Sequence, residues 1–567
     1  MKTQKRNRTS LLTATVALLF IGALIPTAHA ANIWDGGGVD GFWNTASNWD
    51  NDTVPAASQN LTFSGNVQTI TTNNIASFTV GTGAASTYAI TFGNTGALGT
   101  SAFTLSGNQI MLNAGTGNGG SIISSAVTVG SITDTISLNM SIATTATISP
   151  GSNHNLIITG LLTQANGKKQ LTKAGNGELI LRNAGNNYLG ATTINAGTLT
   201  VDVAGGIKNA GVASALGAGA AGVDSLIGFS GGTLNVSLGA GSTDRQVRIG
   251  NATPASTGGA NINNNSANGS SNPLLFSNAA FNVSAGAITA NRLLSLGGAN
   301  TDANAISGVI SDNNTAGGGT VSLTKSGSGR WILSGANTYT GATTVNGGTL
   351  LVSAGGSISQ SSLTTVTTGT TLTANGTVGA VAVNTGGTLN GAGTVGTTTV
   401  AGTLTPGNSP GVLNVNGNLT MASGGNMVWE LFANTATQSS PAVFDQVLVS
   451  GDLAFSGSNG ITLNFGTTAD GSTVSWSDSF WSSSRSFLIY DVAGSTTGFS
   501  NLSLLNTSFN DATGAALAAS QGSFSVGQLG SDVFLNYNAI PEPSSGTLLG
   551  FGLGGLVLAR LLRRKQS

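Results

Sequence analysis

The chain contains, at residues 171–177, the stretch Leu171-Thr172-Lys173-Ala174-Gly175-Asn176-Gly177, which recurs 152 residues later as Leu323-Thr324-Lys325-Ser326-Gly327-Ser328-Gly329. The likeness continues beyond this motif, because Tyr188 to Val201 matches Tyr339 to Val352 after a slip of one residue. Two copies of this length are a true internal repeat. They indicate a fold in which similar units stack on one another.

The final Gly-Thr-Leu of each copy also occurs outside the two copies. It begins at Gly197, Gly232, Gly348, Gly387 and Gly402, at irregular spacings. We interpret these sites as starts of strands in degraded turns of a repetitive structure, because strict tandem modules would keep one spacing.

Alternation of apolar and polar residues predicts what the turns are made of. Ile136, Leu138, Met140 and Ile142 alternate with Ser137, Asn139 and Ser141, which is the pattern of a strand with one buried face. Short strands of this kind, each ended by Gly or Asn, favour an all-β solenoid whose successive turns pair their backbones. Asn195, Asn346 and Asn384 stand just before corners, where they form either an amide ladder between turns or solitary turns.

The repeat resembles the autotransporter-associated β-strand repeat, whose form runs Leu-Thr-Lys-x-Gly-x-Gly, a strand, Asn-x-Tyr-x-Gly-x-Thr and Asn-x-Gly-Thr-Leu. Residues 171–201 and 323–352 match it nearly throughout, and residues 376–418 look like the late turns of the same family. The resemblance implies a right-handed parallel β-helix.

The N-terminus has the order of a secretory signal peptide. Four basic residues precede an apolar run from Leu11 to Ile25, and the tripeptide Ala28-His29-Ala30 follows. We expect cleavage between Ala30 and Ala31. A retained membrane helix is the alternative, but the run is shorter than the roughly 20 residues that a span needs.

The C-terminus combines a tripeptide, an apolar stretch and a basic end. Pro541-Glu542-Pro543 is followed by an apolar stretch up to Ala559 and by basic residues that we expect on the cytoplasmic side. These basic residues are Arg560, Arg563, Arg564 and Lys565.

All three parts, in this order, resemble the PEP-CTERM sorting signal of envelope bacteria. The resemblance implies recognition by a membrane enzyme called exosortase, a bacterium that makes extracellular polysaccharide, and delivery to the cell surface or matrix. A single-pass tail anchor is the alternative. The secretion machinery, the exosortase-type enzyme and extracellular polysaccharide are therefore the expected partners, with the membrane contacted through the C-terminal helix before processing.

Composition excludes several functions. Gly makes up 85 of 567 residues, and charged residues make up only 7%. Without the eight basic residues of the two ends and Glu542, 11 basic residues face 19 acidic ones, so the body is near −8 and nucleic acid is not an expected partner. Cysteine is absent and His154 is the one histidine beyond the signal peptide, so we expect no cofactor and interpret His154 as an exposed loop residue.

An enzyme is the rival interpretation, since parallel β-helices also carry polysaccharide lyases and hydrolases. Such a site needs converging carboxylates, but the body has only Glu178 and Glu430 besides scattered aspartates. Two aspartate pairs, Asp50 with Asp52 and Asp445 with Asp452, lack the spacing of a calcium loop. We therefore predict no enzymatic activity and no metal site.

Aromatic residues gather near both ends of the body, and we predict that they close the solenoid. They are Trp34, Trp43 and Trp49 at one end, and Trp476, Phe480, Trp481, Phe487 and Tyr490 at the other. Stacking on sugar rings is the alternative role. The predicted organisation is a signal peptide at 1–30, a solenoid at 31–443, terminal turns or a small β-domain at 444–539, and the sorting segment at 540–567.

The sequence predicts a structural or adhesive surface protein that is associated with extracellular polysaccharide through a face rich in Thr, Ser and Asn. A sugar-processing enzyme and a passive surface spacer are the alternatives.

Overall fold

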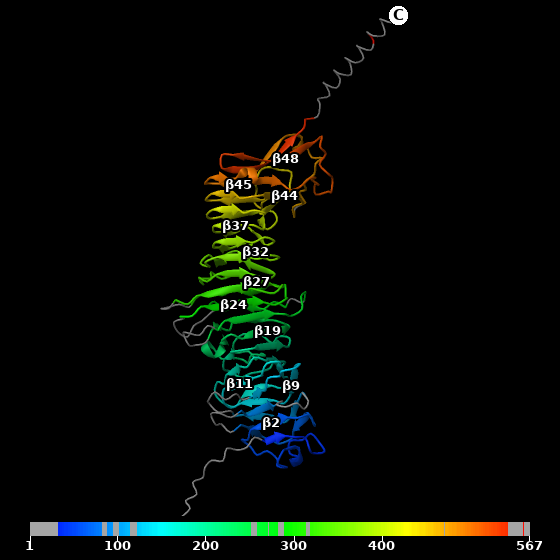
Figure 1. Ribbon diagram of the computed structural model, residues 1–567, viewed down its shortest axis with the longest axis vertical. Coiled ribbons are helices and arrows are strands. Elements are labelled where there is room, and N and C mark those ends of the chain that lie inside the picture. Colours follow the sequence, from blue (N-terminus) through cyan, green and yellow to red (C-terminus); the bar gives the residue numbers. More distant parts are fainter. Residues whose placement is uncertain are drawn as a thin grey trace, which may run out of the picture.

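Parallel strands stack along the long axis of the molecule (Figure 1). The computed structural model describes residues 32–541, except 82–87, 94–100, 114–121, 251–257, 270–271, 282–288, 313–317 and 470, together with Arg560. Colours run from blue at one end to red at the other, so turns that are neighbours in sequence are neighbours in space. The predicted all-β solenoid with parallel pairing is confirmed, and its right-handedness stays a prediction.

The described strands form five ladders. The N-terminal ladder consists, in order, of β1 (Asn32–Trp34), β2 (Leu61–Ser64), β5 (Ile90–Gly93), β8 (Ile122–Ser124), β11 (Ala146–Ser149), β14 (Leu171–Lys173), β16 (Thr192–Ile194), β18 (Ile227–Phe229) and β21 (Val247–Ile249). The short ladder consists of β4 (Phe78–Val80), β7 (Ile110–Leu112), β10 (Met140–Ile142) and β13 (Leu162–Gln164).

The long ladder runs through most of the molecule. It consists of β3 (Ile70–Asn73), β6 (Thr104–Gly107), β9 (Ile132–Ile136), β12 (His154–Ile158), β15 (Glu178–Leu181), β17 (Thr198–Asp202), β19 (Thr233–Leu238), β22 (Ala260–Asn264), β24 (Arg292–Gly297), β26 (Val321–Lys325), β28 (Thr343–Val345), β31 (Thr364–Val366), β34 (Val381–Val383), β37 (Thr398–Val400), β40 (Leu419–Met421), β43 (Leu453–Phe455) and β46 (Thr496–Thr497).

Two further ladders complete the second half. The C-terminal ladder consists of β20 (Ser242–Thr243), β23 (Leu275–Phe276), β25 (Asn304–Ile306), β27 (Arg330–Leu333), β29 (Thr349–Val352), β32 (Thr371–Ala374), β35 (Thr388–Gly391), β38 (Thr403–Pro406), β41 (Asn426–Leu431), β44 (Asn459–Phe465) and β47 (Leu502–Leu504). The capped ladder consists of β30 (Ser357–Ile358), β33 (Thr377–Val378), β36 (Thr394–Val395), β39 (Val412–Val415), β42 (Gln446–Val449), β45 (Arg485–Val492), β49 (Asp532–Ala539) and β48 (Gly522–Leu529).

Short 3-10 helices lie between some strands. They are η1 (Ala46–Asn48), η2 (Gly222–Ser225), η3 (Ser479–Ser482) and η4 (Phe499–Asn501). In the described part of the chain, no helix is long and apolar enough to cross a membrane.

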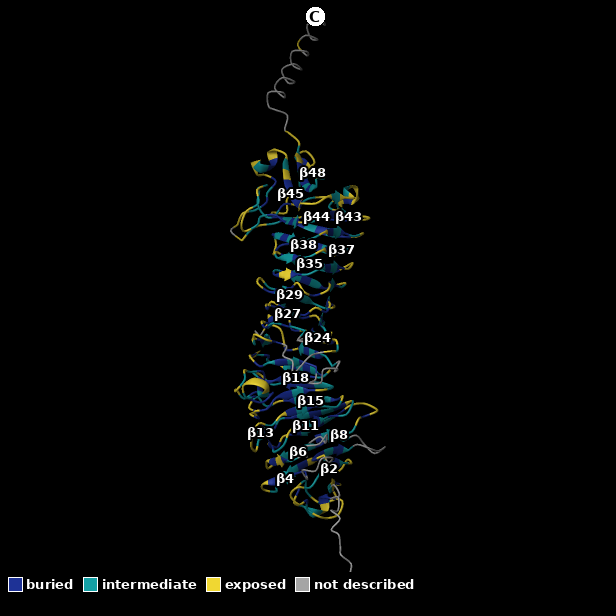
Figure 2. Ribbon diagram, turned by 90° about the vertical axis from the view of Figure 1, so that its left-hand side faces the viewer, coloured by how far each residue is buried: buried dark blue, intermediate teal, exposed yellow. Residues whose placement is uncertain are grey.

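Stacked apolar side chains fill the interior, which Figure 2 shows as dark blue along the whole axis. In the C-terminal ladder, for example, Leu350, Leu372, Leu389 and Leu404 are partners from one turn to the next, and none of them is exposed. The residue between two inward positions of a strand faces outward, as the alternation predicts.

Turns differ in length, as the irregular Gly-Thr-Leu spacing predicts. One turn takes 21 residues from Thr343 to its partner Thr364, and 17 from Thr364 to Val381. From Leu419 to Leu453 a turn takes 34 residues. The additional residues lie outside the paired strands, so the ladders stay in register while the loops vary.

Each copy of the repeat builds two stacked turns. The first copy forms β14 to β17, in which β14 pairs with β16 and β15 pairs with β17. The second copy forms β26 to β29 with the equivalent pairing.

A buried lysine joins the two turns of each copy. Lys173 is fully buried, and its Nζ donates to the carbonyls of Ala174 at 2.7 Å, Gly175 at 2.9 Å and Ala196 at 2.9 Å. Lys325 makes the same three contacts in the second copy. Burial lowers the pKa of both ammonium groups to about 8, so they stay charged at neutral pH and supply three N–H donors to three carbonyls.

A buried amide bridges neighbouring turns in a similar way. Asn186 Oδ1 accepts from the backbone N–H of Leu162, and its Nδ2 donates to the carbonyl of Ala215. Asn337 Oδ1 accepts from Ile310 N, and its Nδ2 donates to the Ser357 carbonyl on the following turn. The amide of Asn-x-Tyr therefore replaces backbone pairing where the chain leaves its strands.

The corner asparagines are turn formers. Asn195, Asn346 and Asn384 are all exposed, and no hydrogen bond joins their side chains. The amide-ladder alternative is therefore wrong for these three, because each side chain points to solvent from its turn.

Both ends are closed by aromatic side chains. Trp34, Trp43 and Trp49 are at most 1% exposed, and the Trp34 and Trp49 rings meet edge to face at 5.2 Å. At the other end Trp476, Trp481, Phe487 and Tyr490 are buried and Phe480 is half-buried, which agrees with the predicted closing role.

Beyond residue 444 the strands continue the stack before the direction of pairing changes. β42, β43 and β44 pair in parallel with the preceding turn. β49 then runs antiparallel to both β45 and β48, so that a hairpin lies over the last turns.

We expect the substitutions Lys173→Met and Lys325→Met each to lower the free energy of unfolding by about 1–3 kcal/mol, because buried carbonyls lose their donor. The midpoint of urea-induced unfolding, followed by circular dichroism, measures this change. Lys168→Met is the matched control, since Lys168 is exposed and pairs only with Asp224 at the surface. Equal midpoints for all three variants would contradict the bridging role of the buried lysines.

Candidate binding surface and pocket

Outward rows of hydroxyl and amide groups follow the ladders, and we call them the hydroxyl ranks. On the long ladder Thr344, Thr365, Ala382, Thr399 and Thr420 are partners from turn to turn, and four of these five carry a hydroxyl. The other ranks lie on the C-terminal and capped ladders. They are Thr371, Thr388, Thr403 and Asn426; Thr373, Asn390 and Thr405; and Ser357, Thr377, Thr394 and Asn414.

Register explains why the ranks form. Neighbouring strands lie about 4.8 Å apart, so each outward position repeats once per turn at that spacing. Thr suits these positions because β-branched side chains pack well on a pleated surface.

The same segment carries no charge. From Trp331 to Trp429 the sequence has no Asp, Glu, Lys, Arg or His. The ranks therefore offer hydrogen bonds without an ionic component, and they cannot discriminate a partner by its charge.

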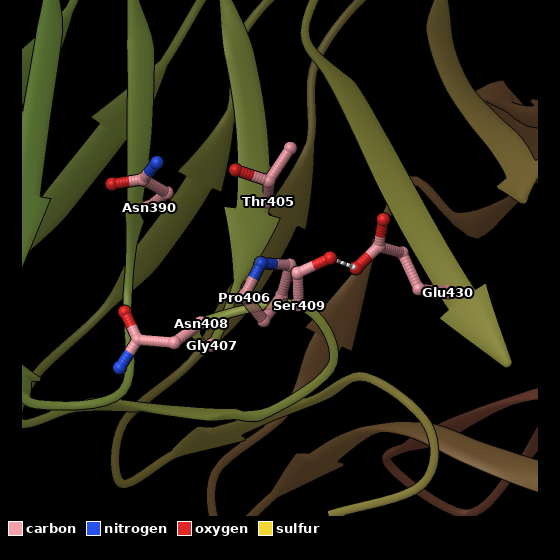
Figure 3. A pocket seen from close by; sticks show the side chains of 7 residues that line it. All are labelled: Asn390, Thr405, Pro406, Gly407, Asn408, Ser409 and Glu430. Carbon is pink, nitrogen blue, oxygen red and sulfur yellow. Dashed lines mark hydrogen bonds between the residues drawn. The ribbon is translucent and has the colours of Figure 1, made fainter. Parts of the chain in front are cut away.

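A polar pocket ends this uncharged segment (Figure 3). It has a volume of about 370 Å³ and is lined by Asn390, Thr405, Pro406, Gly407, Asn408, Ser409 and Glu430. Figure 3 shows Asn390 and Thr405 on neighbouring strands, with Glu430 on the opposite side of the pocket. We call it the Glu430 pocket.

Hydrogen bonds fix its single carboxylate. Glu430 Oε2 accepts from Ser409 Oγ at 2.6 Å, and Oε1 accepts from Asn464 Nδ2 at 3.0 Å. The loop that carries Ser409 is held by Gly407, whose N–H donates to the Gly391 carbonyl at 2.8 Å. Gly407 has φ +79, which a residue with a Cβ rarely adopts.

A second carboxyl group, Asp445, lies beneath the pocket and is fully buried. Its two oxygens accept from the backbone N–H groups of Gly411 at 2.7 Å and Glu430 at 3.1 Å. Burial raises the pKa of Asp445 to about 8, so the group carries its proton at neutral pH. Asp445 supports the loop and cannot reach a substrate, which leaves Glu430 without a second acid in the pocket.

The two aspartate pairs considered for calcium form no shared site. Asp452 is exposed and accepts from Ser495, whereas Asp445 is buried against Gly411. Asp50 accepts from the backbone N–H of Ile33. Within the described ranges, no group of three His, Cys, Asp or Glu side chains is placed to hold a metal ion.

The interpretation of His154 as an exposed loop residue is wrong. His154 is the first residue of β12 and is fully buried, as is Asp134 on the neighbouring β9. His154 Nε2 lies 2.5 Å from Asp134 Oδ2, and Nδ1 lies 2.9 Å from the Ser125 carbonyl. The alternation that begins with His154 and continues through Leu156 and Ile158 was the signal that sequence reasoning missed.

The two contacts of His154 determine its proton count. Both partners are acceptors, so the ring is matched when both nitrogens carry a proton. Burial alone would lower the pKa of His154, but the hydrogen bond and the charge of Asp134, with the Ser125 carbonyl, outweigh it and raise the pKa. The pair is enclosed and serves the packing between two turns.

Most residues of the predicted targeting sites lie outside the described residues. These are Ala28, Ala30, Ala31, Glu542, Pro543, Arg563, Arg564 and Lys565. Pro541 and Arg560 are described and exposed. The predicted apolar helix of 540–567 likewise falls outside the described part, apart from its residues 540, 541 and 560.

The fold is thus a parallel β-solenoid whose two best-conserved internal copies have known counterparts. Residues 171–201 and 323–352 match the Passenger-associated-transport-repeat family, which agrees with the autotransporter-associated repeat predicted there. Over 187 residues, or 33% of this chain, the sequence is 30% identical to the adhesin BmaC autotransporter of Brucella suis biovar 1 (strain 1330). This alignment spans 5% of the length of that adhesin.

We expect the His154–Asp134 pair to make stability depend on pH. The folded pKa of His154 is raised above its ordinary value of 6.5, so the stabilisation is complete below that value and is lost as the pH rises through the raised pKa. Asp134→Asn supplies an N–H donor to a neutral ring and should flatten this loss. Thermal unfolding temperatures between about pH 5 and about pH 9 measure the effect.

The control is Asp452→Asn, because the pKa of this exposed carboxyl is lowered and lies below the window. If the Asp134→Asn variant kept the full pH profile of the natural protein, the pair would not hold the additional proton.

Proposed function

We propose that the chain is an exported, non-enzymatic adhesive protein of the cell surface that binds neutral extracellular polysaccharide along its hydroxyl ranks. The observation that carries this proposal is the uncharged segment from Trp331 to Trp429, with ranks of Thr, Ser and Asn in register on its outer faces. The similarity to an adhesin and the passenger-type repeats support the surface location and the adhesive role.

Many weak contacts suit such a partner. One hydroxyl contributes little net free energy to binding, about 0.5–1.5 kcal/mol. A long polymer that contacts several turns at once gains from each further contact, because later contacts form within the same complex. The absence of charge means that salt should not weaken this binding.

Targeting follows the two ends of the sequence. A signal peptide cleaved after Ala30 starts export, and an exosortase-type enzyme recognises Pro541-Glu542-Pro543 while the basic end from Arg560 to Lys565 stays in the cytoplasm. The protein is thereby displayed on the surface or in the matrix. The exposure of Pro541 at the end of the folded body agrees with access for a processing enzyme.

Co-sedimentation of the mature protein with the extracellular polysaccharide of the producing cell tests the adhesive role. We expect binding that persists from low salt to about 0.5 M salt, without release of soluble sugar. The triple variant Thr365→Val, Thr399→Val and Thr420→Val keeps shape and strand preference but removes three hydroxyls, and should weaken binding about tenfold or more.

The matched control replaces the same three threonines by serine, which keeps the hydroxyls. Released sugar would overturn the non-enzymatic role, and an absence of binding would leave a passive spacer as the better account.

Mass spectrometry of the protein recovered from the cell surface tests the targeting. We expect an N-terminus at Ala31 and a C-terminus close to Pro541-Glu542-Pro543, because both ends are predicted processing sites. Replacing the tripeptide by three alanines should leave the tail attached and the protein in the membrane fraction. An intact tail on the surface-displayed natural protein would instead favour a permanent tail anchor.

A further inference from the structure

A second pocket lies in the C-terminal cap, away from the hydroxyl ranks, and we call it the cap pocket. It has a volume of about 590 Å³, which is within the range of small-molecule sites. It is lined by Trp476, Ser477, Asp478, Ser479, Trp481, Ser482, Ser520, Gln521, Ile540 and Pro541.

Two indole rings make its apolar part. Trp476 and Trp481 meet at 4.8 Å between ring centroids, at an angle of 74°. Phe524 packs against both rings and Tyr537 packs against Trp481, so the pair is held rigidly from behind. Rigid aromatic surface binds with little loss of conformational entropy.

One donor in this pocket lacks an acceptor. Trp481 Nε1 donates to Asn434 Oδ1 at 2.9 Å, but Trp476 Nε1 has no hydrogen-bond partner among the described residues. Trp476 is only 4% exposed. A buried N–H without an acceptor costs free energy, and an oxygen of a bound ligand would satisfy it.

The rim is made of hydroxyl and carboxyl groups. Ser479 and Ser520 are exposed on opposite sides of the pocket, and one from the η3 segment and one from the turn before β48. Asp478 uses one oxygen to accept from Phe480 N at 2.7 Å, at the start of η3. No Lys or Arg is among the lining residues, so the pocket disfavours phosphate, sulfate and other acidic groups.

We propose that the cap pocket binds one or two units of a neutral sugar chain. An apolar aromatic floor with a rim of hydroxyl and carboxyl groups matches a sugar ring, which has an apolar C–H face and hydroxyls around its edge. Trp476 Nε1 donates to a ring or hydroxyl oxygen, and Asp478 accepts from a hydroxyl. The proposal rests on the proposed function only for its choice of sugar as the ligand class.

Isothermal titration calorimetry of the mature protein with neutral glucan, mannan and galactan tetrasaccharides tests the site. We expect at least one tetrasaccharide to bind with a millimolar or lower Kd. The substitution Trp476→Phe keeps a ring but removes the N–H, and should raise that Kd about three- to tenfold. Because this N–H has no partner in the free protein, the thermal unfolding temperature should not fall below that of the natural protein by more than the smaller ring accounts for.

A second variant does not touch the aromatic packing. Ser520→Trp places a large side chain at the exposed rim and should abolish tetrasaccharide binding, whereas Ser483→Trp, at an exposed position outside the lining, should not. Failure of all three tetrasaccharides to bind, or equal Kd values for the natural protein and the Trp476→Phe and Ser520→Trp variants, would overturn the proposal.

The valine triple variant separates the two proposals. It leaves the cap pocket intact, so it should bind tetrasaccharide normally while its co-sedimentation with polysaccharide falls. Normal co-sedimentation of the Ser520→Trp variant, together with absent tetrasaccharide binding by the natural protein, would sink the cap pocket alone.

Discussion

Backbone hydrogen bonding between stacked turns is the constraint on which the rest of the structure depends. Each parallel strand takes its register from the strand one turn earlier, so a residue that faces inward stacks on another inward residue, and an outward residue stacks on an outward one. The leucine stack inside and the hydroxyl ranks outside are two results of the same register. Where the backbone leaves a strand, Lys173 and Asn186 supply the missing donors and acceptors.

The sequence was sufficient for the general architecture because the architecture is periodic. Alternation located the strands, and Gly-Thr-Leu marked the starts of β17, β19, β29, β35 and β38. The aromatic caps were also predictable, since large rings near both ends of a stack have few other places to be buried. The repeats at 171–201 and 323–352 carried the family likeness that the comparison bears out.

What the sequence could not provide is the alignment between distant turns. Thr399 and Thr420 become neighbours only because the connection between them makes one turn, while Leu419 and Leu453 need 34 residues for the same step. The same limit hid the partners of His154 and Asp445, whose acceptors and donors come from other turns. A lone histidine in a polar run looked like a loop residue until the chain placed Asp134 one turn earlier, opposite its ring.

Strand direction also sets how the molecule carries mechanical load. The strands run across the long axis, so tension applied at the C-terminal end opens the ladder one turn at a time and loads few hydrogen bonds at once. The antiparallel hairpin of β48 and β49 is the first element to take that tension, because the chain leaves from it. A surface protein built in this way lengthens stepwise under pull and keeps its remaining turns folded, which makes it a shock absorber between a cell and whatever it holds.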